Sequence, residues 1–85
     1  MITYITYNME EKIINILQDL HPEYDFSKNV NFISEGMLDS FDIVSLVSEL
    51  EDNFDITIDG VEIRPENFSS VKSISDLIKH SESNK

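Results

Sequence analysis

The segment EGMLDSFDIVSLVSELEDNF, residues 35–54, contains the strongest structural signal of the chain: a turn with a glycine precedes a long amphipathic segment. Asp39 and Ser40 are both residue types that cap helix N-termini, so we expect a helix from Asp39 or Ser40 to about Phe54. One stripe of this helix is apolar and predicts a core-facing side. The stripe consists of Ile43, Val47, Leu50 and Phe54, flanked by Val44 and Leu46.

The opposite face of the same predicted helix is acidic. Between Lys28 and Arg64 the chain has no Lys or Arg, and overall 17 acidic residues against 6 basic ones give a net charge of −11 at pH 7. A field of this sign repels nucleic acid and anionic lipid and favours basic protein partners. The simpler alternative is a solvated face that keeps a small protein in solution. The face carries Asp42, Ser45, Ser48, Glu49 and Asp52, with Phe41 at its edge.

Length and composition indicate one globular domain. A chain of 85 residues buries only about 60% of its unfolded surface. With 40% hydrophobic residues and no cysteine, its core must be aliphatic and aromatic packing. No apolar run reaches the length of a membrane span, and MITYITY, residues 1–7, lacks the basic flank of a signal peptide. We therefore expect a cytoplasmic monomer without membrane insertion.

The N-terminal third predicts a helix followed by a long loop. Asn8 and Glu11 form a helix-start signal, and apolar residues then recur at helical spacing from Met9 to Leu20, where Pro22 ends the helix. Residues 21–37 show no sustained periodicity, and a loop of this length is uncommon unless it is functional. We expect its apolar side chains to lie under it: Tyr24, Phe26, Val30, Phe32 and Ile33.

The C-terminal third predicts a packed loop, a short helix and a last helix. In residues 55–63 apolar and polar side chains alternate around a turn at Asp59 and Gly60. This pattern fits a short hairpin, but a hairpin would have no sheet to join. We therefore expect a loop that packs inward with Ile56, Ile58 and Ile63 buried. Pro65 suits the first turn of a short helix ending at Phe68. Ser73, with Asp76 three residues on, is expected to cap a last helix whose core side is formed by Ile74, Leu77 and Ile78.

These elements predict an all-α fold, a small four-helix bundle of three main helices and one short helix with a long loop between the first two. The domain is expected at residues 8–80. Residues 1–7 form an N-terminal extension, and residues 81–85 form a tail that we expect to fray.

The segment EGMLDSFDIVSLVSELEDNFDI, Glu35 to Ile56, resembles the acyl and peptidyl carrier proteins, in which a serine after an acidic residue opens the second helix. The resemblance extends to SVKSISDLI, residues 70–78, and covers most of the chain. It implies that Ser40 carries 4′-phosphopantetheine, transferred from coenzyme A by a phosphopantetheinyl transferase with magnesium. It also implies a carrier, not an enzyme, that holds acyl or aminoacyl groups as thioesters for a loading ligase and downstream acyl-transfer enzymes with basic docking patches.

The residues are consistent with this chemistry. The chain has no thiol, so a prosthetic group must supply one, and a phosphodiester on Ser40 would lie at a helix N-terminus, where negative charge is favoured. Asp39 would be repelled by that phosphate, so capping and recognition are its expected roles. The alternative is that Ser40 only caps a helix. The recognition residues that the resemblance implies are Asp39, Phe41, Asp42, Ser48, Glu49 and Asp52.

Departures from the family pattern concern the type of carrier. Fatty-acid carriers usually have glycine three residues before the modified serine and leucine directly after it, whereas Met37 and Phe41 occupy these positions. The order EGMLDSF is more similar to D-alanyl carriers and to stand-alone specialised carriers, but Asp42 stands where the D-alanyl type usually has glycine. The cargo stays open between fatty-acid, polyketide, peptide and D-alanyl transfer.

A second hypothesis is an EF-hand-like calcium loop from Asp55 to Glu66. Gly60 would form its turn, although Pro65 and the lack of a second loop depart from that pattern. Its oxygen ligands would be Asp55, Thr57, Asp59 and Glu66.

The two histidines do not indicate catalysis. His21 precedes a proline in the loop and His80 lies near the C-terminus, so we expect two solvated surface residues rather than a catalytic base or a metal site.

Overall fold

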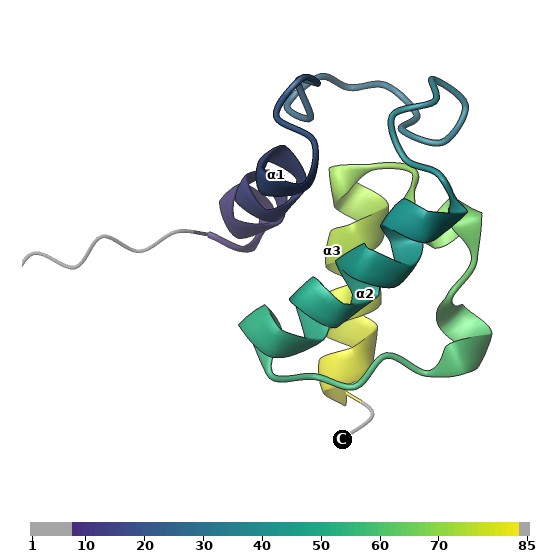
Figure 1. Ribbon diagram of the computed structural model, residues 1–85. Coiled ribbons are helices and arrows are strands. Elements are labelled where there is room, and N and C mark those ends of the chain that lie inside the picture. The colour runs from purple at the N-terminus through teal and green to yellow at the C-terminus, as the bar shows by residue number, and fades with distance from the viewer. Residues whose placement is uncertain (1–7, 84–85) are drawn as a thin grey trace, which may run out of the picture.

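The structure is a computed structural model that describes residues 8–83, and within that range it is all helical with no strand (Figure 1). Helix α1 spans Met9–Leu20, α2 spans Ser40–Phe54 and α3 spans Val71–Ser83. Two short 3-10 helices, η1 at Gly60–Glu62 and η2 at Pro65–Phe68, connect α2 to α3. The all-α prediction with a long first connection is confirmed.

Helices α1 and α2 begin where the sequence predicts, because side-chain caps are local features. The Asn8 side chain accepts a hydrogen bond from the backbone N–H of Glu11 at 2.8 Å. At α2 the Asp39 carboxylate accepts from the N–H of Asp42, and the Asp42 carboxylate accepts from the N–H of Asp39, both at 2.9 Å. This reciprocal capping box makes Asp39 the cap and Ser40 the first helical residue.

The connection after α2 is a packed loop, as predicted. Asp55 ends the helix in the left-handed region with φ 52°, and the Glu51 carboxylate accepts from the N–H of Ile58 at 2.9 Å. Ile56 and Ile58 are buried. The prediction for Ile63 was wrong: its side chain is 38% exposed, because the 3-10 turn at Gly60–Glu62 interrupts the two-residue alternation that would have turned it inward.

The predicted start of the last helix was also wrong. Helix α3 begins at Val71, after Ser70, whose carbonyl accepts from the N–H of Ile74 at 3.1 Å. The Ser70 hydroxyl accepts from the N–H of Ser73, and the Ser73 hydroxyl accepts from the N–H of Ser70. Ser73 therefore fills the third helical position of a capping box usually completed by Glu or Gln, and the Ser73–Asp76 pattern placed the start one turn late.

The far end of α3 runs beyond residue 80. Ser81 is buried and its hydroxyl donates to the carbonyl of Leu77 at 2.9 Å, so the helix continues through the first part of the predicted tail to Ser83. The predicted N-terminal extension, residues 1–7, and the last two residues lie outside the described part of the chain.

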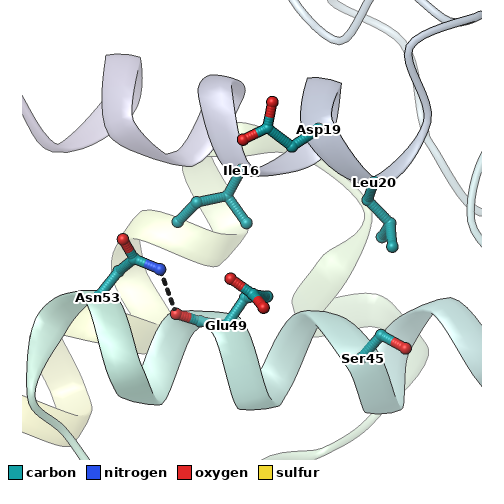
Figure 2. Close-up of a pocket in the computed structure, with 6 residues that line it drawn as sticks. All are labelled: Ile16, Asp19, Leu20, Ser45, Glu49 and Asn53. Carbon is teal, nitrogen blue, oxygen red and sulfur yellow. Dashed lines mark hydrogen bonds between the residues drawn. The ribbon is translucent and has the colours of Figure 1, made fainter.

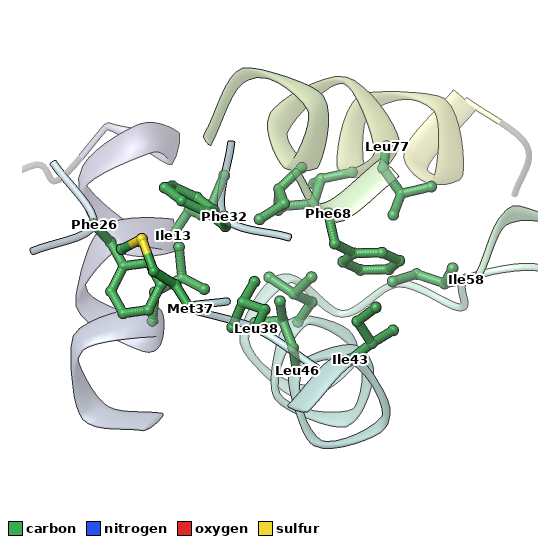
Figure 3. Close-up of a cluster of buried hydrophobic side chains, with 14 of the residues drawn as sticks. Ile13, Phe26, Phe32, Met37, Leu38, Ile43, Leu46, Ile58, Phe68 and Leu77 are labelled. Atoms are coloured by element: carbon green, nitrogen blue, oxygen red, sulfur yellow. The ribbon is translucent and has the colours of Figure 1, made fainter. Parts of the chain in front are cut away.

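The core lies between the three helices and under the long loop, which arches over one end of the bundle (Figure 1). Figure 3 shows Phe26 and Met37 beside α1 and Phe68 between α2 and α3. The Phe26 and Phe32 rings meet edge to face, with centroids 5.1 Å apart. The predicted core faces of the helices are buried at Ile13, Leu17, Ile43, Leu46, Leu50, Ile74, Leu77 and Ile78.

Two predicted core positions face solvent instead. Tyr24 is exposed because Phe26 is the buried aromatic residue in this part of the loop. The Tyr24 ring packs edge-on against the Phe26 ring, with centroids 6.2 Å apart. Val44 is 69% exposed because it lies at the edge of the apolar stripe, on the side of α2 turned away from the buried Ile43 and Leu46.

Candidate functional site

Ser40, the predicted attachment residue, is exposed at the first position of α2. Its hydroxyl forms no hydrogen bond with any residue in the range 8–83, whereas the hydroxyls of Ser70 and Ser73 are both used to cap α3. Capping of α2 is done by Asp39. The alternative in which Ser40 serves only as a helix cap is therefore not what the structure shows.

The residues that lead into α2 are anchored to the long loop and to the core. Gly36 adopts φ +73°, a backbone conformation that L side chains rarely take. The N–H groups of Met37 and Leu38 then donate to the carbonyl of Phe32 at 2.9 and 3.2 Å. Met37 and Leu38 are buried, so the backbone emerges at the surface only at Asp39 and Ser40.

The long loop itself is tied to the helices. The Gln18 side chain accepts from the N–H of Phe26 at 2.9 Å and donates to the carbonyl of Tyr24 at 2.8 Å. The N–H of Phe32 donates to the carbonyl of Ser69, next to η2, at 2.8 Å. The loop thus holds the N-terminus of α2 against the rest of the bundle.

His21 lies beside the candidate site, although the sequence did not indicate it. It was predicted to be solvated, but its side chain is only 25% exposed, and its Nε2 lies 2.8 Å from Oδ1 of Asp42 in the first turn of α2. Its Nδ1 lies 3.1 Å from a carboxylate oxygen of Glu23. The available signal was a histidine directly after a helix, where a cation is favoured by the helix C-terminus; its contact with Asp42 has no sequence signature.

The pKa values of this pair shift in opposite directions. Burial lowers the pKa of His21, but the carboxylates of Asp42 and Glu23 outweigh it and the net pKa lies above its usual value. Burial raises the pKa of Asp42, but the N–H of Asp39 and the ring of His21 outweigh it and the net pKa lies below its usual value. Asp42 is therefore ionised at neutral pH, and His21 keeps its proton to higher pH than a free histidine.

The first turn of α2 fits a phosphodiester-linked arm on Ser40. The serine oxygen is open to solvent, and the N–H groups and dipole of the helix N-terminus favour a negative group there. Two neighbouring carboxylates oppose that charge, yet the Asp42 carboxylate is compensated by His21 and both carboxylates already accept backbone N–H bonds. The residues present thus accommodate the group.

The predicted recognition residues do not form one surface. Asp39 and Asp42 form the capping box. Phe41 is 84% exposed beside Ser40, and Ser48 and Asp52 follow it along the exposed side of α2. We call these three residues, together with the exposed Val44, the outer face of α2. Glu49 lies elsewhere, on the side of α2 that faces α1.

Glu49 lines a groove of about 430 Å³ between α1 and α2 (Figure 2). The amide of Asn53 donates to the carbonyl of Glu49 at 2.8 Å, while the Glu49 carboxylate rises toward α1. Within residues 8–83 neither Glu49 nor Asp19 forms an ion pair. The groove thus combines two carboxylates with two apolar side chains of α1; its lining is Ile16, Asp19, Leu20, Ser45, Glu49 and Asn53.

The calcium hypothesis finds no support in the structure. In the described part of the chain no group of three or more His, Asp or Glu side chains could hold a metal ion. Among the proposed ligands, the Asp59 carboxylate accepts from the N–H of Val61 at 3.2 Å, and Glu66 lies 3.8 Å from Nη1 of Arg64. Ile56 and Ile58, which lie between these residues in the sequence, are buried, so the loop is packed onto the core.

None of the helices in residues 8–83 is long and apolar enough to cross a bilayer.

Comparisons with known proteins agree with the geometry. Residues 11–80 match the family model described as the phosphopantetheine attachment site. The chain is 35% identical over 69 residues to the D-alanyl carrier protein of Streptococcus suis, which covers 79% of this chain and 86% of that protein. It is 31% identical over 77 residues to the acyl carrier protein of Lactobacillus acidophilus, covering 84% and 90%. No solved structure gives a significant match.

The match spans most of α1 through most of α3, so it includes the anchored loop, the first turn of α2 and the helix that carries the outer face. This chain therefore belongs to the phosphopantetheine-attachment family of carrier proteins, a family of carriers for a 4′-phosphopantetheine group and not of enzymes.

Proposed function

We propose that Ser40 carries the 4′-phosphopantetheine arm and that the protein delivers acyl or aminoacyl groups held on it as thioesters. The observation that supports this assignment is the open Ser40 hydroxyl, which makes no hydrogen bond within residues 8–83 because Asp39 caps α2 in its place. A serine that is exposed, placed at the first position of a helix and not needed as its cap is the acceptor that a modifying enzyme needs.

Attachment forms a P–O bond between the Ser40 oxygen and the phosphorus nearer the pantetheine. The pyrophosphate bond of coenzyme A breaks, adenosine 3′,5′-bisphosphate leaves, and the hydroxyl proton passes to the transferase or to water. When bound, the arm supplies the thiol that the cysteine-free chain lacks. The chain itself contributes the helix N-terminus that favours the diester charge and the anchored loop that fixes where the arm begins. Since coenzyme A is the donor, we place this protein in the cytoplasm.

The outer face of α2 is our proposed docking surface for the transferase, the loading ligase and the acyl-transfer enzymes. Phe41 stands next to the attachment residue with 84% of its surface exposed, and Val44 is exposed one turn further along. Asp52 supplies negative charge on the same side, in a chain with a net charge of −11. A partner with a basic patch around a small apolar pocket is complementary to this arrangement.

Incubation of the apo protein with coenzyme A, magnesium and a broad-specificity phosphopantetheinyl transferase tests the attachment residue. We expect intact mass to increase by one arm in the wild type and not in Ser40→Ala. Ser45→Ala is the matched control, because Ser45 is an exposed serine of the same helix and should leave the modification unchanged. An unmodified wild type, with a transferase that is active on another carrier, would contradict the proposal.

The cargo is tested on the loaded protein. The two named relatives, a D-alanyl carrier protein and an acyl carrier protein, have similar identities to this chain, 35% and 31%. The holo protein is therefore offered separately to a D-alanine-activating ligase and to a fatty-acyl-loading enzyme. The added mass and its release by hydroxylamine, which cleaves thioesters, identify the group carried.

A further inference from the structure

His21 lies where α1, the long loop and the first turn of α2 meet. Its backbone N–H still belongs to α1, donating to the carbonyl of Leu17 at 2.9 Å. Its ring packs against Tyr24 in the loop, with centroids 5.6 Å apart, and contacts Asp42 on α2. One side chain therefore joins the end of α1 and the start of the loop to the first turn of α2, which is distant in the sequence.

Asp42 links His21 to Asp39, the residue before Ser40, because its two carboxylate oxygens have different partners. Oδ1 lies 2.8 Å from Nε2 of His21, and Oδ2 accepts from the N–H of Asp39 at 2.9 Å. Asp39 in turn caps the helix that Ser40 opens. The Asp42 carboxylate is thus held by two groups, the ring of His21 and the backbone N–H of Asp39, which directly precedes Ser40.

The groups that face the His21 ring favour its protonated form. Glu23 in the loop and Asp42 on α2 are both carboxylates, and the C-terminal carbonyls of α1 also favour a cation. The N-terminal dipole of α2 opposes it, but the ionised Asp42 stands between that dipole and the ring. The Nε2 atom is buried, and its contact with Asp42 is an ion pair rather than an aligned hydrogen bond, so its strength depends on the charge of the ring.

We propose that His21 is a positioning residue for the modification of Ser40: its protonated ring holds the Asp42 carboxylate and thereby fixes the first turn of α2 for the transferase. This inference rests on the proposed attachment of the arm at Ser40. When the ring loses its proton, it keeps a single N–H for two carboxylates and no charge, so its hold on the Asp42 carboxylate weakens and the first turn becomes less well ordered. The modification of this carrier is then pH-dependent through the carrier itself.

The first experiment does not depend on the arm. In the full-length apo protein, the ring of His21 and the backbone amides of Asp39, Ser40 and Asp42 are followed by NMR from acidic to alkaline pH. We expect these amides to titrate with the midpoint of His21 in the wild type, and to lose that transition in His21→Gln. His80→Gln is the matched control, because His80 is the other histidine and lies on α3 beside Thr57 and Asp59. A chemical shift of the Ser40 amide that does not change with the titration of His21 would overturn the proposal.

The second experiment measures transfer of the arm. The ratio of the wild-type rate to the His21→Gln rate removes the pH dependence of the transferase itself. We expect a ratio of about 3 at pH values below the His21 midpoint, the size of a partly exposed ion pair, falling toward one at alkaline pH. The change should appear in the KM for the carrier. His21→Lys, which keeps a cation opposite Asp42 throughout this range, should restore the rate and remove the pH dependence.

The outcomes separate this inference from the proposed function. A ratio that does not change with pH, or a His21→Lys variant no better than His21→Gln, overturns the positioning role while Ser40 remains the attachment residue. If no arm is added to Ser40 at any pH, the proposed function fails. The NMR titration then still decides whether His21 orders the start of α2.

Discussion

Gly36 is the residue whose backbone most directly controls the entry into α2. Its φ of +73° turns the chain so that Met37 and Leu38 enter the core and the next two residues reach the surface. Any residue with a Cβ is strained in this conformation whatever the space around it, and no neighbouring atom lies within 4 Å of the point that a Cβ would occupy at this position. The requirement here is conformational and not steric.

We therefore expect Gly36→Ala to lower the free energy of unfolding by about 1 kcal/mol. Gly60→Ala is the matched control, since Gly60 has equally open surroundings but no positive φ, and it should have a smaller effect or none. Urea unfolding of the two variants, followed by circular dichroism, provides the comparison. Equal losses at the two glycines would mean that φ at residue 36 does not limit stability.

His21 and Asp42 predict a pH dependence of stability at the same scale. Because the pKa of His21 is raised on folding, the pair contributes fully below about pH 6.5, the ordinary value, and this contribution is lost as pH rises through the higher folded pKa. Because the pKa of Asp42 is lowered, its contribution holds above about pH 3.9 and is lost as pH falls through the lower folded pKa.

The difference in unfolding free energy between the wild type and His21→Gln should thus be largest at mildly acidic pH and shrink at alkaline pH. Urea titrations at about pH 6 and about pH 9 measure it. A difference that is constant over this range would show that the ring contributes by packing and not by charge.

Helix α2 is the element on which the separate parts of the site come together. Its start carries the predicted attachment residue, its buried side holds the core, and its exposed residues divide between the outer face and the groove against α1. Asp52 belongs to the first of these surfaces and Glu49 to the second. The acidic face predicted from the helical wheel is thus two surfaces, because α1 packs along one side of α2.

Charge reversal separates these two surfaces. Asp52→Lys and Glu49→Lys change the net charge equally, so a difference between them reports position and not the overall field. We expect Asp52→Lys to slow association with the transferase roughly fivefold at low salt, with a smaller effect of Glu49→Lys. Association rates at several salt concentrations are the measurement. Equal slowing would point to long-range steering, and indifference to both changes would place the docking surface elsewhere.

The cap of α2 is a second property of this element. Asp39→Ala removes the acceptor for the N–H of Asp42 and should cost about 1 kcal/mol of unfolding free energy. Asp39→Asn keeps a capping oxygen without the charge and should retain most of the stability. Thermal unfolding of the two variants tests this. If Asp39→Asn were as damaging as Asp39→Ala, the carboxylate charge and not the cap would be the stabilising feature.

At the scale of the whole molecule, negative charge acts against folding. The net charge is −11, and the segment from residue 29 to residue 63 contains no Lys or Arg. Ion pairs such as those of His21 with Glu23, Arg64 with Glu62 and Glu66, and Lys72 with Asp76 join partners no more than four residues apart, so they leave the long-range repulsion in place. The pair between His21 and Asp42 instead joins residues far apart in the sequence.

We expect sodium chloride to raise the melting temperature, because added salt screens this repulsion within a Debye length of about 10 Å at 0.1 M. A gain of about 1 kcal/mol corresponds to roughly 4–8 °C for a domain of this size. Differential scanning calorimetry of the wild type over a salt series measures it, and Asp52→Lys should show a smaller salt effect. A melting temperature that is independent of salt would mean that the charges are already compensated in the fold.

Features that depend on neighbours along the chain were predictable from the sequence alone. Helices α1 and α2, the cap at Asp39, the buried stripe around Leu50 and the short helix at Pro65 all follow from signals a few residues apart. Where such signals compete, two predictions were wrong. Ser70 and not Ser73 caps α3, and a 3-10 turn leaves Ile63 exposed. Family membership was also predictable, because the residues around Ser40 are contiguous.

Which surfaces of these elements meet depends on the packing of the folded chain and could not be predicted. Glu49 lines a groove because α1 packs along that side of α2, which the helical wheel does not contain. The ring of His21 reaches Asp42 because the anchored loop returns the chain to the end of α1. Contacts between residues far apart in the sequence carry no periodic signal, so the partner of His21 and its charge state emerge only from the folded chain.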